Sequence, residues 1–241
     1  GPNTDNKKAL YYPHYYPYPP KIVTILEGIK NKVKSKIEIL YAKGTELIEP
    51  SESKAKALQI AKKSDLIVGV FGLTGDIEGE EGYVIGPLRG DRKNLKLPKV
   101  QEEMIKELND LGKPFILILT SGSALAIDYA KENIPAIVQA WYAGCEGGNA
   151  ISDVIFGDYN PAGRLPITFY KSINQLPNYE DYSMIDRTYR YFDGEVIYPF
   201  GYGLSYTEFV YNNLEISPNE INKENNITIK VDIKNTGEYA G

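Results

Sequence analysis

Apolar positions along residues 22–157 alternate between two spacings, one typical of amphipathic helices and the other of buried strands. Spacing of three and four residues predicts helices over residues 23–35, 98–111, 124–131 and 147–156, and a further helix capped by Ser51 or Ser53. Short apolar or alternating runs predict strands over residues 36–41, 65–72, 115–120 and 136–141. Strand–helix alternation of this kind predicts an α/β fold with a mostly parallel sheet and helices on both faces, an α/β sandwich.

The texture of the chain changes after Gly157, which stands where a helix C-cap is expected. Residues 160–169 and 176–203 are rich in Pro, Gly and Tyr, which predicts irregular segments with short strands. Alternating apolar residues from about 210 onward predict the opening strands of a β-sandwich. We therefore expect an α/β domain over residues 1–209, with a Tyr/Pro/Gly-rich connection from about 158, and a partial β-sandwich over 210–241. The pattern starts and ends abruptly, which predicts that the chain was cut at both ends from a longer protein.

Composition excludes several classes of partner. The formal net charge is −5, which argues against nucleic acid because phosphate binding needs a basic face. No apolar run approaches the roughly 20 residues that span a bilayer, and the polar N-terminus is not a signal peptide. We expect no nucleic-acid and no membrane partner, and the compartment stays open.

The chain has one cysteine, Cys145, and one histidine, His14. An internal disulfide is therefore excluded, and a histidine-based triad or a multi-histidine metal site is disfavoured. Cys145 has no nearby base in the sequence and is predicted to be inert. The run of Tyr and Pro around His14 favours an extended strap packed on a neighbour over a ligand site.

An acidic, glycine-rich loop over residues 75–92 follows the strand at 65–72. It holds four carboxylates within six residues, Asp76, Glu78, Glu80 and Glu81. Loops leaving the carboxyl ends of strands are where open α/β sheets bind ligands, and crowded carboxylates can keep one of their number protonated. The alternative is a solvated acidic loop that binds nothing.

Two other motifs have mainly structural interpretations. Trp141 and Tyr142, at the end of a strand, could face a sugar, but packing between domains is favoured. Gly147 and Gly148 suit a close backbone approach at a helix start. They form no phosphate loop, since neither G-x-G-x-x-G nor a following Lys-Ser/Thr is present.

Several long motifs, in order along the chain, resemble the C-terminal half of glycoside hydrolase family 3, the β-glucosidase and β-xylosidase family. These are G-P-N-T-D-N near the start, S-D-L-I-V-G-V-F-G-L-T at 64–74, and R-T-Y-R-Y-F-D-G and Y-P-F-G-Y-G-L-S-Y-T-E-F at 187–194 and 198–209. The most specific is V-Q-A-W-Y-A-G-C-E-G-G-N-A-I-S-D-V-I-F-G-D-Y-N-P-A-G-R-L-P-I-T-F at 138–169.

The resemblance implies an active site split between two domains. In this family a (β/α)8 barrel supplies an aspartate nucleophile and the α/β sandwich supplies a glutamate acid/base, and a fibronectin-III-like domain often follows. This chain then carries the acid/base but no nucleophile. We expect the barrel in cis or as a separate chain, inactivity of this chain alone, and no metal or organic cofactor.

The resemblance leaves the choice of glutamate open. Family loops often read G-E-G-Y followed by D-R. Aligning the C-terminal part of this loop with that pattern, including Asp91-Arg92 downstream, selects Glu81. Aligning its N-terminal part, I-E-G-E, selects Glu80 instead. Glu78 is the remaining alternative. We take Glu81 as the first choice.

The implied function is that of a retaining exo-acting β-glycosidase, a β-xylosidase or β-glucosidase. Its substrates would be oligosaccharides or aryl and alkyl β-glycosides with terminal non-reducing β-linked sugars, and R-T-Y-R-Y-F-D-G leans toward xylosidase-type members. The alternative is a non-catalytic carbohydrate-binding or interaction module of the same fold.

Overall fold

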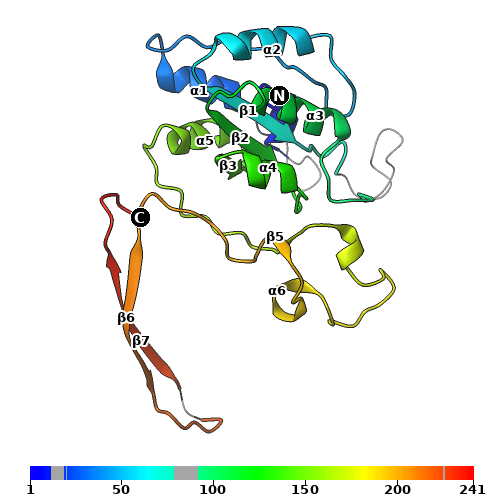
Figure 1. The fold of residues 1–241 in the computed structure, drawn as a ribbon. Helices are drawn as coiled ribbons and strands as arrows, with labels where there is room; N and C mark the ends of the chain where they lie inside the picture. Colours follow the sequence, from blue (N-terminus) through cyan, green and yellow to red (C-terminus); the bar gives the residue numbers. More distant parts are fainter. Residues whose placement is uncertain (12–18, 20, 79–91, 225) are drawn as a thin grey trace.

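The computed structural model describes residues 1–11, 19, 21–78, 92–224 and 226–241. A parallel sheet lies at its centre, with strand order β1 (Ile67–Gly72), β2 (Phe115–Thr120) and β3 (Ala136–Gln139) (Figure 1). Register pairs Val70 of β1 with Ile118 of β2. The predicted strands over 65–72, 115–120 and 136–141 are confirmed, the first and third slightly shortened.

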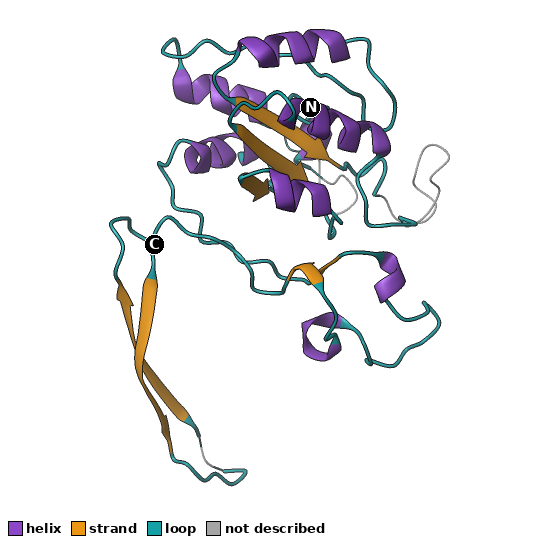
Figure 2. Cartoon of the chain, viewed as in Figure 1, coloured by secondary structure: helices purple, strands orange, loops and turns teal. Residues whose placement is uncertain are grey.

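Helices cover both faces of this sheet, as the sequence predicts (Figure 2). One face packs against α2 (Lys54–Lys63), α3 (Lys99–Asn109) and α4 (Asp128–Asn133), and the other against α1 (Ile25–Val33) and α5 (Gly147–Ile155). Because successive strand residues point to opposite faces, β2 places Phe115, Leu117 and Leu119 in the first core and Ile118 in the second. Burial on both faces explains why these strands are continuously apolar.

Helices α1 and α5 cross at two glycines, Gly28 and Gly148. A Cβ on Gly148 would lie 2.0 Å from the Thr24 carbonyl oxygen, and one on Gly28 would lie 2.1 Å from the Gly148 carbonyl oxygen. Thr24 also caps α1, since its hydroxyl accepts from Glu27 N while the Glu27 carboxylate accepts from Thr24 N. The close approach expected at residues 147–148 is therefore a helix–helix contact.

The predicted strand over 36–41 is wrong. Ile37, Leu40 and Tyr41 are exposed, and these residues form no strand. The outer edge of β1 already has partners: Asn3 N donates to Val70 O, and the Gln101 side chain bonds to Gly72. At these positions the segment has no free edge of β1 to pair with, and an alternating pattern alone forms no strand.

Two helix starts also differ from prediction. The predicted helix over 124–131 begins only at Asp128, since the preceding backbone bonds to another segment through Ala126 N, which donates to Leu95 O. Ser53 stands at the N-cap of α2 without a side-chain cap bond, and its hydroxyl accepts from Gly44 N instead. The predicted C-cap is confirmed, as Gly157 follows α5 with a φ of +77°.

Smaller elements complete the described chain, and all but one of them follow Gly157. The remaining elements are 3-10 helices at Lys7–Ala9 and Ile173–Gln175, α6 (Thr188–Tyr191), and the antiparallel pairs β4 (Phe169–Tyr170) with β5 (Val196–Tyr198) and β6 (Phe209–Ser217) with β7 (Thr228–Asn235). The β6–β7 hairpin extends away from the α/β sandwich in Figure 1, and all of its described residues are exposed. None of the helices in the described ranges is long and apolar enough to cross a membrane.

Candidate functional site

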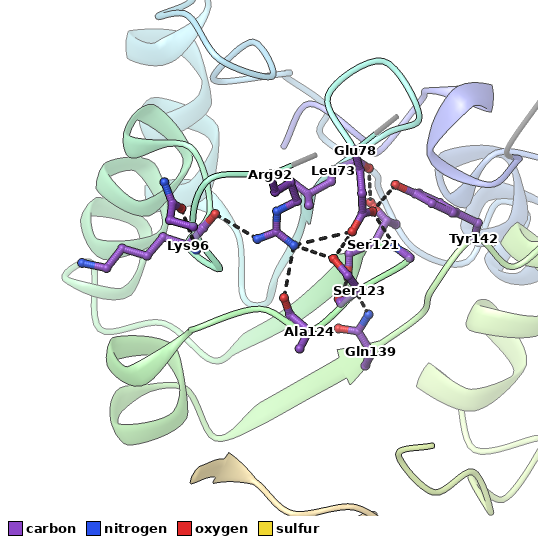
Figure 3. A network of polar contacts seen from close by, with 12 residues as sticks. Leu73, Glu78, Arg92, Lys96, Ser121, Ser123, Ala124, Gln139 and Tyr142 are labelled. Carbon is purple, nitrogen blue, oxygen red and sulfur yellow. Dashed lines mark hydrogen bonds and ion pairs between the residues drawn. The ribbon is translucent and has the colours of Figure 1, made fainter. Parts of the chain in front are cut away.

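The loops that leave the three parallel strands meet at the carboxyl edge of the sheet. Glu78 follows β1, Gly122 and Ser123 follow β2, and Tyr142 follows β3. Figure 3 shows the side chains of Glu78, Ser123, Tyr142 and Arg92 turned toward one another. Parallel strands end at the same edge, so residues of these three loops that are 19 to 64 positions apart in sequence become neighbours here.

The Glu78 carboxylate is the centre of this cluster. Its Oε2 accepts hydrogen bonds from Gly122 N at 2.6 Å and from the Tyr142 hydroxyl at 2.5 Å. Its Oε1 accepts from the Ser123 hydroxyl and lies 3.5 Å from Nη1 of Arg92. The side chain is only 10% exposed. Both oxygens of this carboxylate therefore have partners within the cluster, two on each oxygen.

Arg92 is held as firmly as its partner. Its Nη1 donates to the Ser123 hydroxyl at 2.5 Å and to Ala124 O at 3.2 Å, and its Nη2 donates to Lys96 O at 3.4 Å. Burial lowers the pKa of the Arg92 guanidinium, and the neighbouring Glu78 opposes that shift. A guanidinium keeps its proton in proteins, so Arg92 is a fixed positive charge.

A second layer of hydrogen bonds supports the loop after β2. Gln139 Nε2 donates to the Ser121 hydroxyl at 2.9 Å, which donates in turn to Ser123 O at 2.8 Å. The peptide that carries the Ser123 side chain is thereby tied to β3. Ser123 can then donate to Glu78 while it accepts from Arg92.

The end of β1 is fixed by a buried amide on α3. Gln101 Oε1 accepts from Gly72 N at 2.7 Å, and Gln101 Nε2 donates to Gly72 O at 2.9 Å and Leu47 O at 2.8 Å. Gly72 has a φ of +126°, and a Cβ there would lie 2.0 Å from Thr120 O. Only glycine suits this position, and Gln101 bonds to Gly72 as a neighbouring strand would.

The first two predicted acid/base residues, Glu81 and Glu80, lie outside the described residues, as do Asp91 and His14. Of the three candidate acid/base glutamates, Glu78 is the one that the structure describes. Its carboxylate is enclosed by Gly122, Ser123, Tyr142 and Arg92.

The two aromatic residues after β3 have separate roles. Tyr142 donates to Glu78, whereas Trp141 packs edge-on against Phe169, with ring centroids 6.0 Å apart and an interplanar angle of 83°. Trp141 has a φ of +54°. This left-handed backbone conformation turns the chain between Trp141 and Tyr142, whose side chains contact different neighbours.

Sequence reasoning missed Ser123 and Gln101. A signal existed for Gln101: it stands on the apolar stripe of α3 with Met104, Ile105 and Leu108, and it is fully buried. A polar residue at such a position must have buried partners. Ser123 carried no comparable signal.

The described residues hold no group of three or more His, Cys, Asp or Glu side chains placed to bind a metal ion. Cys145 is exposed. The functional groups in the described part of the site are carboxylate, guanidinium, hydroxyl and amide groups.

Comparison with known proteins identifies the family of this domain. The sequence profile described as "Glycosyl hydrolase family 3 C-terminal domain" matches residues 1–206.

Curated relatives are named as β-xylosidases and β-glucosidases. A xylan 1,4-beta-xylosidase of Xylanibacter ruminicola is 50% identical over 172 residues, covering 70% of this chain and 20% of the relative. A periplasmic beta-glucosidase of Salmonella typhimurium is 36% identical over 252 residues, covering 91% of this chain and 32% of the relative. The chain therefore spans between a fifth and a third of the length of these relatives.

Solved structures of a β-glucosidase and a β-xylosidase also resemble this chain. A β-glucosidase from Erythrobacter marinus matches with a TM-score of 0.81 and 33% identity, over 100% of this chain and 35% of that one. A family 3 exo-β-xylosidase bound to a xylobiose aziridine probe matches with a TM-score of 0.77 and 29% identity, over 88% of this chain and 28% of that one. On the profile match, the relatives and the shared fold, this chain belongs to glycosyl hydrolase family 3 and corresponds to its C-terminal α/β domain.

Proposed function

We propose that this chain is the acid/base-bearing part of a retaining exo-acting β-glycosidase. The observation that carries the proposal is that Glu78 and Arg92 lie together at the carboxyl edge of the parallel sheet. These two residues flank residues 79–91 in the sequence, which contain Glu80 and Glu81. That edge is where α/β sheets present functional groups, and the named relatives are glycosidases.

The proposed chemistry uses two carboxyl groups about 5–5.5 Å apart. A carboxylate on a (β/α)8 barrel, in cis or on a separate chain, attacks the anomeric carbon, while a carboxylic acid from this chain protonates the leaving glycosidic oxygen. The same group, now a carboxylate, then removes a proton from the water that attacks the glycosyl-enzyme. Both carboxyls return to their starting states, so the reaction needs no metal or organic cofactor.

We assign the acid/base to Glu81 first and Glu80 second. Glu78 is poorly suited because four donors surround its carboxylate. A general acid must reach the substrate with its proton, whereas both oxygens of Glu78 are engaged by Gly122, Ser123, Tyr142 and Arg92. A charge-matched, 10% exposed carboxylate is also poorly placed to reach a sugar.

The proposed substrates are β-xylosides or β-glucosides with terminal non-reducing sugars. The relative with 50% identity is named a xylan 1,4-beta-xylosidase, which supports the lean toward xylosides. An aryl xyloside and the matching aryl glucoside, assayed in parallel, decide between them.

We also propose that residues 1–209 and 210–241 belong to two domains, the second the opening of a fibronectin-III-like β-sandwich. The family profile ends at residue 206, close to this boundary. In the β6–β7 hairpin, register pairs Tyr211 with Ile233 and Ile216 with Ile229, and all four are exposed. An apolar hairpin face of this kind is typical of one half of a sandwich core.

The proposal is tested on a polypeptide that joins this chain to its barrel. We expect hydrolysis of 4-nitrophenyl β-xyloside or β-glucoside, and a loss of about 10²–10⁴-fold for the Glu→Gln variant of the true acid/base, the range that general acid–base catalysis contributes. Azide should restore turnover in that variant alone, with the glycosyl azide as product. No hydrolysis by the joined protein would refute the proposal and favour a non-catalytic module. Hydrolysis that neither Glu80→Gln nor Glu81→Gln affects would refute the assignment of the acid/base to these two residues.

A further inference from the structure

The Glu78–Arg92 ion pair joins the two residues that flank residues 79–91 in the sequence. Nη1 of Arg92 lies 3.5 Å from Oε1 of Glu78, although 13 residues separate them in sequence. Both side chains are nearly buried, at 13% and 10% exposure. The other ion pairs in the described part of the chain have at least one partner 43% or more exposed, or 42% and 39% in the case of Lys54–Glu107.

The surrounding hydrogen bonds make this pair rigid. Ser123 bridges it, donating to Glu78 and accepting from Arg92. Gly122 N and Tyr142 bind the other carboxylate oxygen, and Ala124 O accepts from the guanidinium. The partners come from the loops that follow β2 and β3 (Figure 3), so Glu78 and Arg92, which flank residues 79–91 in the sequence, are both attached to the rigid sheet.

We propose that Glu78 and Arg92 are positioning residues that set where the acid/base glutamate meets the substrate. The inference rests on the proposed function, because it takes the acid/base to lie on residues 79–91. A segment whose two ends are fixed samples fewer arrangements than one with free ends. Misplacement of a reacting group by about 1 Å can cost about 10²-fold in rate. A substitution that releases Glu78 or Arg92 from its partners should therefore slow proton transfer to the leaving group.

The test is the dependence of rate on the leaving group, measured for Glu78→Gln in the barrel-containing protein. General acid help is needed for a poor leaving group such as the sugar of xylobiose, and hardly at all for 2,4-dinitrophenolate. We expect kcat/KM for xylobiose to fall about 100-fold, and kcat/KM for 2,4-dinitrophenyl β-xyloside to fall less than about threefold. If the joined protein prefers glucosides, the corresponding glucosides are used. Azide should give no rescue, since the acid/base carboxyl is still present.

Two variants guard against trivial effects. Glu107→Gln makes the same chemical change in the exposed Lys54–Glu107 pair, and both rates should stay unchanged. Ser123→Ala removes the bridging hydroxyl without leaving a buried charge alone, and should show the same leaving-group pattern at about tenfold. It replaces Glu78→Gln if that variant fails to fold, as judged by circular dichroism.

Three outcomes would overturn the inference. Equal losses for both substrates would mean that Glu78 only supports the fold. Azide rescue with a glycosyl azide product would mean that Glu78 is itself the acid/base, and unchanged rates would mean that the pair does not position the segment. Failure of the proposed function looks different, because then neither Glu80→Gln nor Glu81→Gln shows a leaving-group-dependent loss.

Discussion

Replacing Gln101 by Met should destabilise this chain strongly, although methionine has nearly the same size and favours helices at least as well. Gln101 is fully buried on α3. Its amide bonds to both Gly72 N and Gly72 O, and to Leu47 O. A thioether cannot donate and accepts only weakly, so all three backbone groups lose this partner.

The magnitude follows from the burial of those groups. Leaving a buried backbone donor or acceptor unpaired costs about 1–3 kcal/mol, so the two groups of Gly72 together give about 2–6 kcal/mol. The carbonyl of the half-buried Leu47 can be hydrated and adds little. Burial of the more apolar methionine offsets about 1 kcal/mol, so we expect a loss of about 3 kcal/mol. That is a large share of the roughly 5–15 kcal/mol that stabilises a native protein.

Urea unfolding followed by tryptophan fluorescence measures this loss. Trp141 is the only tryptophan, and it packs on Phe169, so its emission should report unfolding of the α/β core. The matched control is Gln59→Met, the same change at an exposed position of α2, where we expect a change within about 0.5 kcal/mol.

A loss below about 1 kcal/mol for Gln101→Met, with an unchanged m-value, would refute the reasoning. It would mean that Gly72 finds other partners and that the end of β1 does not depend on α3.

Two further predictions concern stability. Gly148→Ala should cost more than about 2 kcal/mol despite a gain of up to about 1 kcal/mol in helix propensity, because the new Cβ would meet Thr24 O at 2.0 Å; Gly163→Ala, with nothing within 4 Å, is the neutral control in the same denaturation assay. Burial raises the pKa of Glu102 in the folded state, so the folded protein holds its proton more tightly. Glu102→Gln should therefore raise stability at pH 7 by less than about 1 kcal/mol, given partial exposure, and the gain should vanish as the pH falls below 4.5, the ordinary value. A gain that persists in acid would contradict this assignment.

The sheet and its flanking helices could be predicted because their signals are local. The apolar run of β2, Phe115–Thr120, is predicted to the residue, since a strand buried on both faces needs apolar side chains throughout. Helix α5 is predicted to within one residue by its apolar stripe and by Gly157 after it. The failed strand at residues 36–41 shows the limit, because whether an alternating segment pairs depends on a free strand edge elsewhere in the chain.

The site divides in the same way. Sequence order alone located the acidic loop after β1 and, through the resemblance, the family. It did not separate the three glutamates, since Glu78, Glu80 and Glu81 differ little in local sequence. Nothing in the local sequence predicts that Glu78 pairs with Arg92 and bonds to Ser123, because those contacts join loops that follow different strands.

By itself, the sequence determined the order and type of most elements, the family, and the segment that holds the candidate acid/base residues. The tertiary structure decided which strand edge was already paired, which helix crossing required glycine, and which carboxylate is fixed in a hydrogen-bond network. The reason is physical. Periodicity and capping act between near neighbours along the chain, whereas desolvation and charge pairing depend on groups that only the folded sheet brings within a few ångströms.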